Sequence, residues 1–216
     1  MVPERFIFEY AQRSMELLTI VETHAHQKKL VGSFALIIAT SVFMIPYERA
    51  KKRHPLYEHG QDGELYDSIR AVERQRFLKA GFWQHDPPTH WRFSRILKNV
   101  NSTDRWFDRD GRHPMACDAE NTIKRRKVSD VLRVLRNALA HGNVVYLDEK
   151  GLEVKGAKVQ YLAFLSRYEE TPEDREKSET YRLVATTEEQ FLSFVKQWAK
   201  WLTTLPADDK LVEAAE

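Results

Sequence analysis

Three residues near the middle of the chain, Arg136, Asn137 and His141, have side chains suited to acid–base and phosphate chemistry. The imidazole of a histidine titrates near neutral pH and can act as a general acid or a general base. A guanidinium keeps its positive charge and grips phosphate oxygens through a planar fork. Asn137 could orient either the imidazole or the phosphate. Together the three residues predict chemistry on a phosphate group.

We expect these residues to lie on a short, capped helix formed by residues 129–143. Ser129 or Asp130 offers a side-chain oxygen to the first-turn amides, and Gly142 stands where a left-handed C-cap belongs. At about 100° per residue, the apolar residues fall on one side, which we expect to face the core: Val131, Leu132, Leu135, Ala138 and Leu139. The other side carries, in angular order, Arg136, Ala140, Arg133, Asn137 and His141. The small Ala140 leaves room there for a bound group.

Helical periodicity predicts further helices on both sides of this segment. Long helices are expected at about 4–22 and 26–45, with Pro46 ending the second, and a third helix at about 62–82. A short helix is expected at 91–100. Thr186 and Glu189 form a capping-box pattern that predicts the start of a final amphipathic helix.

The periodicity changes after Gly142, where alternating residues predict strands at 144–147, 152–154, 158–168 and 181–186. Residues 169–179 are nearly all charged or polar and predict a loop. The expected fold class is therefore mainly α, a helical bundle with a small antiparallel β-sheet inserted before the last helix. We expect a single domain over 1–216, with the β insertion at about 143–187 and a frayed tail at 207–216.

The Arg-Asn-x-x-x-His element formed by Arg136, Asn137 and His141, within a mainly helical chain, resembles the HEPN superfamily (higher eukaryotes and prokaryotes nucleotide-binding domains). The family signature is an Arg, a polar neighbour and a His four to six positions further on. The resemblance is close over the motif and covers the helical bundle in outline. The predicted sheet and the irregular segment 101–117 depart from a minimal member of the family.

The resemblance implies a metal-independent endoribonuclease of the prokaryotic toxin or phage-defence type, with no cofactor and with RNA as its partner. Cleavage needs a base for the 2′-hydroxyl, an acid for the leaving 5′-oxygen and positive charge on the transition state. Arg136 and His141 fit these catalytic roles, supported by Asn137, but one such set lacks either the acid or the base. Two motifs facing one cleft in a homodimer would supply both. An antitoxin or another defence protein is a further possible partner.

A basic run, Lys124, Arg125, Arg126 and Lys127, leads directly into the predicted motif helix. Together with Arg133 it is our candidate for contacts with an RNA backbone. The alternative interpretation of the run is a solvated charged segment.

Composition places few limits on the function. Of 216 residues, 31% are charged and 42% are apolar, which is typical of a soluble globular protein. The net charge of +2 creates no overall field for a polyanion, so any RNA affinity must come from local clusters. Cys117 is the only cysteine, which excludes an intrachain disulfide and suits the cytoplasm. The apolar run 30–45 is shorter than a membrane span and predicts a buried helix.

Two alternatives to catalysis remain open at the level of the sequence. In the first, the motif helix belongs to a non-catalytic HEPN-like module that binds nucleotide or protein and dimerises. In the second, Arg133 and Arg136 are solvated helix charges, Asn137 is a surface residue and His141 caps the helix C-terminus. The protein would then be a structural interaction protein, resting on its apolar second helix and aromatic last helix.

Other patterns carry weaker signals. Arg49 and His54 repeat the Arg-to-His spacing without the Asn and end at Pro55, so we interpret them as a coincidence. His24 and His26 have a spacing that can bind zinc on a strand, but they lie at a predicted helix junction without a third ligand. The five tryptophans could stack on bases, although packing in the core explains them more simply.

Overall fold

The computed structural model describes residues 6–51, 63–83, 88–97, 100–167 and 180–205. The predicted loop at 169–179 and the predicted tail at 207–216 lie outside the described residues. Within them the chain is mainly helical, as expected. The α-helices are α1 (Phe6–Gln27), α2 (Val31–Ala39), α3 (Ile45–Lys51), α4 (Gly63–Glu73), α5 (Val128–His141) and α7 (Glu188–Thr203).

Two predicted helix boundaries were wrong near the start of the chain. The first helix continues to Gln27, and the chain then turns through Lys29, whose φ is +57°. Pro46 does not end the second helix: a π-helical turn, Thr40–Met44, joins α2 to α3, which contains Pro46. Proline lacks an N–H and crowds the preceding turn, so a local change from α to π geometry lets the helix pass through it.

The sheet differs from the predicted insertion because one of its strands precedes the motif helix. Residues 91–100, expected as a helix, instead contain strand β1 (Arg92–Leu97). In the described part of the chain, β1 joins β2 (Val144–Leu147), β3 (Tyr161–Arg167) and β4 (Thr180–Thr187) in the antiparallel order β1-β4-β3-β2. The strand expected at 152–154 is wrong, because these residues form part of a loop.

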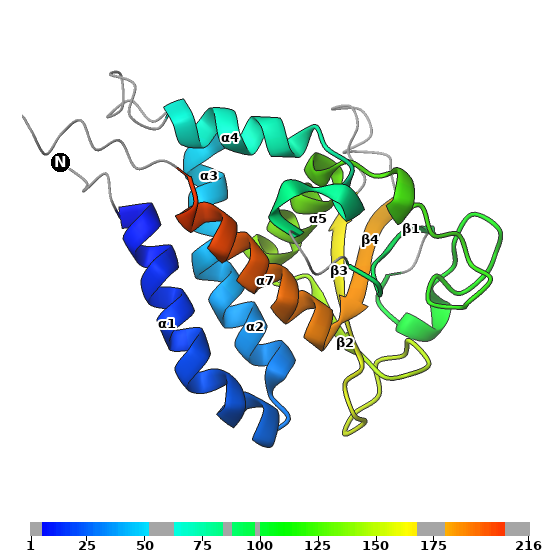
Figure 1. Ribbon diagram of the computed structural model, residues 1–216. Coiled ribbons are helices and arrows are strands. Elements are labelled where there is room, and N and C mark those ends of the chain that lie inside the picture. Colours follow the sequence, from blue (N-terminus) through cyan, green and yellow to red (C-terminus); the bar gives the residue numbers. More distant parts are fainter. Residues whose placement is uncertain (1–5, 52–62, 84–87, 98–99, 168–179, 206–216) are drawn as a thin grey trace, which may run out of the picture.

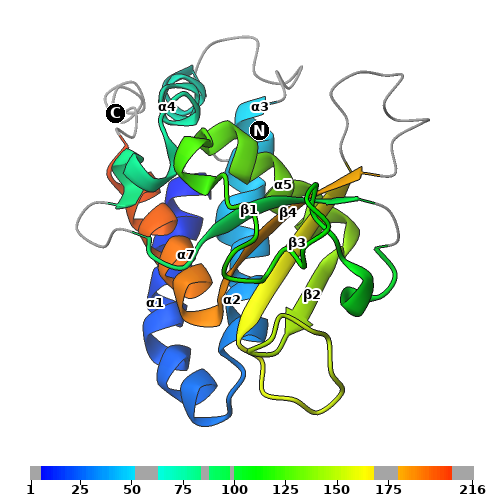
Figure 2. The ribbon, with the colours of Figure 1, turned by 90° about the vertical axis from the view of Figure 1, so that its right-hand side faces the viewer.

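The two faces of the sheet bury different cores. On one face, Phe93, Phe164 and Val184 join the large core that also includes residues of α2, α5 and α7. Figures 1 and 2 show the helices gathered on this side of the sheet, with α7 beside α1 and α2. On the other face, Ile96 and Leu183 pack with the buried Trp106 from the irregular segment. Because β1 is buried on both faces, it lacks the alternating pattern by which a half-buried strand is identified.

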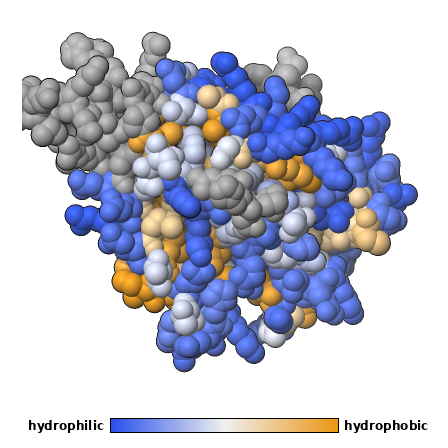
Figure 3. Space-filling model, viewed as in Figure 1, coloured by the Kyte–Doolittle hydropathy of each residue, from blue (hydrophilic) through white to orange (hydrophobic). Residues whose placement is uncertain are grey.

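The helical segment Val31–Glu48 is long and apolar enough to cross a membrane by length and composition. The core helix of a soluble protein passes the same test. In this fold the segment contributes Ala35, Ala39, Val42 and Phe43 to the large core, where it packs against α7, in agreement with the prediction of a buried helix. Figure 3 shows that the surface seen from this side is largely hydrophilic, with apolar patches over α1.

The third and last helices also begin or end elsewhere than predicted. The third helix, expected to reach residue 82, ends at Glu73, and two short 3-10 turns follow it, Phe77–Lys79 and Gly81–Trp83. The last helix is capped by Thr187, whose hydroxyl accepts a hydrogen bond from the Gln190 amide at 3.2 Å. Thr186, the expected cap, is instead a buried residue of β4.

Candidate functional site

Helix α5 carries the Arg-Asn-x-x-x-His element, and its ends are close to the predicted ones. The helix begins at Val128, where the Asp130 carboxylate accepts a hydrogen bond from the Lys127 amide at 3.1 Å. The predicted N-cap, Ser129 or Asp130, was therefore wrong: both residues lie inside the first turn, Lys127 occupies the N-cap, and Asp130 binds the amide of that residue. Gly142 ends the helix in the left-handed conformation, with φ 68°, which a glycine adopts without the strain of a side chain.

The predicted core side of α5 is confirmed by burial. Val131, Leu132, Leu135 and Ala138 are fully buried, and Leu139 packs against the same core while partly exposed. Val134, which is not among the residues expected on this side, is fully buried as well. This apolar side holds α5 against β3 and β4. The polar residues of the element consequently lie along the outer side of a rigidly packed helix.

Arg136 and Asn137 belong to one chain of polar contacts that joins three elements. The Arg136 Nε–H donates to the carboxylate of Glu48 on α3, and its Nη1–H donates to the Asn137 side-chain oxygen at 2.9 Å. Asn137 Nδ2 in turn donates to the hydroxyl of Ser166 on β3 at 3.0 Å. Both charged side chains are partly exposed, Arg136 by 35% and Glu48 by 27%. The contact with Glu48 raises the pKa of Arg136, and burial opposes this shift.

A second polar pair lies beside this chain and reaches α4. Tyr47, almost fully buried, donates its hydroxyl proton to the buried carboxylate of Glu73 at 2.8 Å. Burial raises the pKa of the Tyr47 phenol, and the negative charge of Glu73 raises it further. Arg133 and Arg136 lie near enough for their positive charges to oppose that shift. Sequence reasoning missed Tyr47, Glu48, Glu73 and Ser166, which are far from α5 in the sequence.

His141 lies at the C-terminal end of α5 and is exposed. It is one helical turn beyond Asn137, so the two side chains share an edge of the helix, while Ala140 and Arg133 are also exposed. This edge thus presents an accessible imidazole next to an amide and a guanidinium that other contacts hold in place. An imidazole can exchange protons with a bound molecule, whereas the guanidinium of Arg136 supplies fixed positive charge.

The predicted basic run lies just before α5, and its four side chains differ in exposure and contacts. Lys124 and Arg125 are exposed, and the guanidinium of Arg125 lies 4.0 Å from the carboxylate of Glu120. Arg126 is partly buried and lies over the ring of Phe93 on β1, 4.3 Å from its centroid. Lys127 occupies the N-cap of α5. The structure therefore turns Arg126 toward the sheet and leaves its neighbours at the surface.

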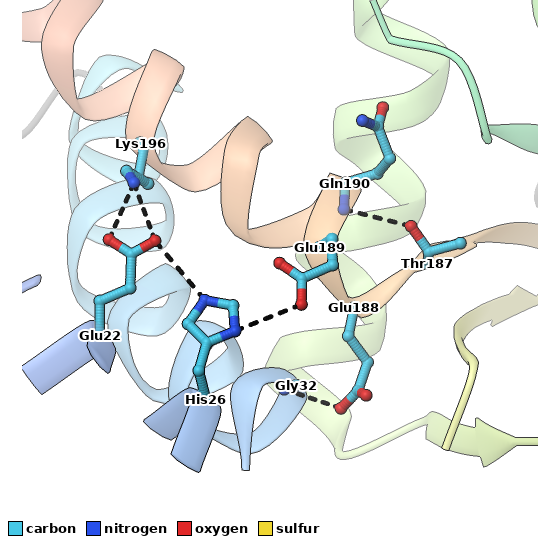
Figure 4. A network of polar contacts seen from close by, with 8 residues as sticks. All are labelled: Glu22, His26, Gly32, Thr187, Glu188, Glu189, Gln190 and Lys196. Carbon is cyan, nitrogen blue, oxygen red and sulfur yellow. Dashed lines mark hydrogen bonds and ion pairs between the residues drawn. The ribbon is translucent and has the colours of Figure 1, made fainter. Parts of the chain in front are cut away.

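A separate polar groove lies between α1 and α7, and Figure 4 shows the polar contacts around it. We call it the α1–α7 groove; it encloses about 270 Å³ and is lined by Glu22, Glu189, Leu192, Ser193, Lys196 and Gln197. Lys196 binds both oxygens of Glu22, at 3.0 and 2.8 Å. His26 lies between two carboxylates, 3.7 Å from Glu22 and 3.5 Å from Glu189.

The same region contains a cap supplied from a distant helix. Glu188, at the start of α7, accepts a hydrogen bond from the Gly32 amide in the first turn of α2 at 2.8 Å. A Cβ atom at Gly32 would lie 2.3 Å from the Glu188 carboxylate oxygen, so a side chain at this position would displace the carboxylate. Burial raises the pKa of Glu188, and the Gly32 amide opposes the shift.

The weaker sequence patterns are placed as follows. Four of the five tryptophans, Trp83, Trp91, Trp106 and Trp198, are buried, which confirms packing as their role. His26 contacts carboxylates of two helices, and among the described residues no group of three or more His, Cys, Asp or Glu side chains is arranged to hold a metal ion. Arg49 lies on α3, but its side chain and His54 are outside the described part of the chain.

A protein-family model described as HEPN pEK499 p136 matches residues 1–208. No curated protein and no solved structure matches the chain.

Proposed function

The chain belongs to the HEPN family, and we propose that it is a metal-independent endoribonuclease of the toxin or defence type. The observation that supports this proposal most is the arrangement along the outer edge of α5. There Arg136 and Asn137 are held between Glu48 and Ser166, while His141, one turn further on, is exposed. Fixed positive charge beside an accessible imidazole is what phosphodiester cleavage without a metal requires.

In the proposed reaction, the 2′-hydroxyl of the RNA attacks the adjacent phosphorus atom. A base removes the hydroxyl proton, the bond between phosphorus and the 5′-oxygen breaks, and an acid protonates that leaving oxygen. His141 acts as either the base or the acid, and Arg136 stabilises the negative charge on the phosphorane-like transition state. The guanidinium carries five N–H groups, so its contacts with Glu48 and Asn137 do not exhaust its donors.

Since one His141 supplies one proton-transfer group, we propose that two copies of the chain pair their α5 edges in a homodimer. Mixing wild-type protein with an excess of the His141→Ala protein tests this pairing. If one cleft needs the His141 of both copies, the mixed dimers are inactive and the activity falls in proportion to the wild-type homodimers that remain. Activity that stays proportional to the total amount of wild-type chain after subunit exchange, shown by mass spectrometry of the mixed dimers, would contradict the shared site.

The direct test of the activity is to incubate the purified protein with total RNA in the presence of a chelator. Wild-type protein should cleave the RNA, whereas the Arg136→Ala and His141→Ala variants should not. His26→Ala is the matched control, because this histidine lies in the α1–α7 groove and should leave cleavage unchanged. Equal rates for the wild type and His141→Ala would refute the proposal.

A non-catalytic nucleotide- or protein-binding module is the second candidate, and the contact between Glu48 and Arg136 favours it. The carboxylate partly neutralises the guanidinium that would otherwise attract a phosphate. In this alternative the wild-type protein binds RNA or another ligand without cleaving RNA. The incubation in chelator separates the two functions, because only the first predicts products that depend on His141.

A further inference from the structure

Two basic segments that are far apart in the sequence lie side by side just before α5. The first is residues 74–79, which follow α4, and the second is the run 124–127. An isolated antiparallel bridge between Arg76 and Lys127 joins the two segments. Figure 2 shows α4 close to the segment that leads into α5. We call residues 74–79 and 124–127 the paired basic segments.

The pairing turns charged side chains outward and apolar side chains inward. The main-chain amides of Phe77 and Val128 each donate a hydrogen bond of 2.9 Å across the pair. Both side chains are fully buried in the large core. Arg76 and Lys127, which lie directly opposite each other in the bridge and so point to the same side, are exposed. Two apolar residues therefore hold the segments together while their charges face solvent.

Positive charge is concentrated in the paired basic segments. They contain seven basic residues and no acidic residue. The chain as a whole has a net charge of +2, so all other residues together carry five net negative charges, the difference between +2 and +7. Arg126 is partly buried over the sheet, whereas the other six cations are exposed: Arg74, Arg76, Lys79, Lys124, Arg125 and Lys127.

The acids next to the paired basic segments offset only part of this charge. Glu120 lies 4.0 Å from Arg125, and an exposed ion pair of this kind contributes little. The carboxylate of Asp130 accepts a hydrogen bond from the N-cap amide of α5. Glu73 is buried and accepts a hydrogen bond from Tyr47. The surface therefore keeps an excess of positive charge, which attracts polyanions from solution.

A ridge of α5 leads from the paired basic segments to the candidate active site. Arg133, Asn137 and His141 are spaced four residues apart, so they lie along one row of the helix surface. Lys127 occupies the N-cap and His141 is the last residue of the helix, which separates them by about 20 Å along the axis. An RNA strand that extends from His141 to the paired basic segments must therefore be several nucleotides long.

We propose that the paired basic segments bind the phosphate backbone of RNA at a distance from the phosphate that is cleaved. The position relative to cleavage rests on the proposed function, whereas the class of ligand follows from the charge of the surface. Contacts of lysine and arginine with phosphates are the same in every sequence, so the site contributes affinity without base specificity. The predicted basic run 124–127 is then one half of the site, and residues 74–79 supply the other half.

The experiment measures binding separately from cleavage, in the His141→Ala background and with a chelator. Fluorescence anisotropy of an end-labelled oligouridylate of about twelve nucleotides gives the dissociation constant at KCl concentrations from about 50 to 200 mM. Arg74→Gln and Lys124→Gln each remove one exposed charge, one from each segment. The matched control, Arg13→Gln, removes one exposed positive charge from α1. Circular dichroism checks the fold of each variant.

We expect Arg74→Gln and Lys124→Gln each to weaken binding about fivefold. The slope of log K against log salt should become shallower by about 0.7 in each variant, whereas Arg13→Gln should change neither quantity. Unchanged affinity and salt slope in a folded Arg74→Gln protein would overturn the proposal. So would equal effects of Arg74→Gln and Arg13→Gln, or competition by polyglutamate as strong as that by unlabelled RNA.

A comparison of substrate lengths tests the distance between this site and the cleaved phosphate. The dinucleotide UpU is too short to extend over about 20 Å from His141. In otherwise wild-type protein, Arg74→Gln should therefore lower kcat/KM for the long oligouridylate and leave that for UpU unchanged. Equal losses for the two substrates would contradict the proposed position.

The two proposals fail in different ways. If the paired basic segments do not bind RNA but the enzyme assignment is right, wild-type protein cleaves RNA, and Arg74→Gln neither weakens binding nor slows cleavage of the long substrate. If the enzyme assignment is wrong but the segments bind RNA, no variant cleaves RNA and the affinity still depends on Arg74 and Lys124.

Discussion

The α1–α7 groove and the edge of α5 both combine a histidine with carboxylates and a cation, yet their charges are arranged differently. In the groove, Lys196 binds both oxygens of Glu22 and His26 lies between Glu22 and Glu189. Lys196 on α7 contacts an acid of α1, and His26 on α1 contacts an acid of α7, so these contacts connect the two helices. At the α5 edge one carboxylate, Glu48, contacts Arg136, while His141 and Arg133 are exposed.

This difference separates a structural polar network from a candidate binding surface. A network whose charges are matched within the chain stabilises the packing of helices and has little to offer an external ion. A surface with excess positive charge attracts a polyanion from solution. The comparison also shows why residue types alone are a poor guide, since a histidine, a cation and a carboxylate occur in both regions.

Of the variants that separate the two regions, we expect His141→Ala to have the largest effect on RNA cleavage. Loss of a general acid or base lowers the rate of RNA cleavage by about 100-fold or more. Single-turnover cleavage in chelator measures the rate, with His26→Ala as the control from the groove. A similar loss in both variants would show that the two histidines do not differ in role.

A smaller loss of activity is expected from Asn137→Ala, which interrupts the chain from Glu48 to Ser166. The variant removes the hydrogen bonds that Asn137 makes with Arg136 and Ser166. We expect cleavage to slow about tenfold because the Arg136 side chain is then less well aligned. Ser166→Ala should have a weaker effect because Arg136 keeps its contact with Asn137. The ratio of kcat to KM for the two variants measures the difference; a larger defect in Ser166→Ala would contradict this order.

Glu48→Gln is expected to raise RNA affinity a fewfold, because it removes a negative charge from the side of Arg136. The same change breaks an ion pair that is partly buried and should lower the free energy of unfolding by about 1 kcal/mol. Fluorescence anisotropy of an end-labelled oligouridylate measures the first effect, and denaturant unfolding measures the second. Weaker RNA binding would instead identify Glu48 as a residue that positions Arg136 for its ligand.

In the groove, Glu22→Gln should act on stability alone. It removes the bidentate contact with Lys196 and one of the two acids near His26, at a cost of about 0.5–1 kcal/mol. The melting temperature should fall by about 1–4 °C, and RNA binding and cleavage should remain as in the wild type. A loss of RNA affinity without a loss of stability would place ligand binding in the groove.

The smallest effect concerns the pH dependence that Glu188 contributes. Its pKa is raised from the ordinary value of 4.5, so the folded state holds this proton more tightly than the unfolded state. The contribution of Glu188 to stability is therefore greatest below pH 4.5 and is lost as the pH rises through the folded pKa. As the pH rises over this range, the wild type should lose stability relative to Glu188→Gln, so the melting temperature of the variant minus that of the wild type should increase. A constant difference would contradict the shift.

Sequence patterns predicted local features of the fold well where one face of an element is polar and the other buried. Helix α5 is the clearest example, because its leucine stripe and Gly142 specify both the buried side and the end. They failed at β1, which is buried on both faces, and at Pro46, where a π-helical turn accommodates a residue that normally ends a helix. They also misplaced the cap of α7 by one residue, since Thr186 and Thr187 are chemically equivalent.

The motif residues of the candidate site were predicted from the sequence, but their contact partners were not. Arg136 contacts Glu48 from 88 positions away, and Asn137 contacts Ser166 on a strand. Contacts of this kind depend on the tertiary fold, which no local pattern encodes. Arg126 was predicted as one of four basic residues, and its position over Phe93 became visible only in the structure.

In the proposed function, RNA binds along the α5 edge and not in the region of α1 and α7. Labelling of arginines with phenylglyoxal in the His141→Ala protein, with and without an oligouridylate, measures this directly by mass spectrometry. RNA should protect Arg133 on α5 and leave Arg13 on α1 reactive, although both are exposed in the free protein. Protection of Arg13 with continued labelling of Arg133 would contradict the proposal.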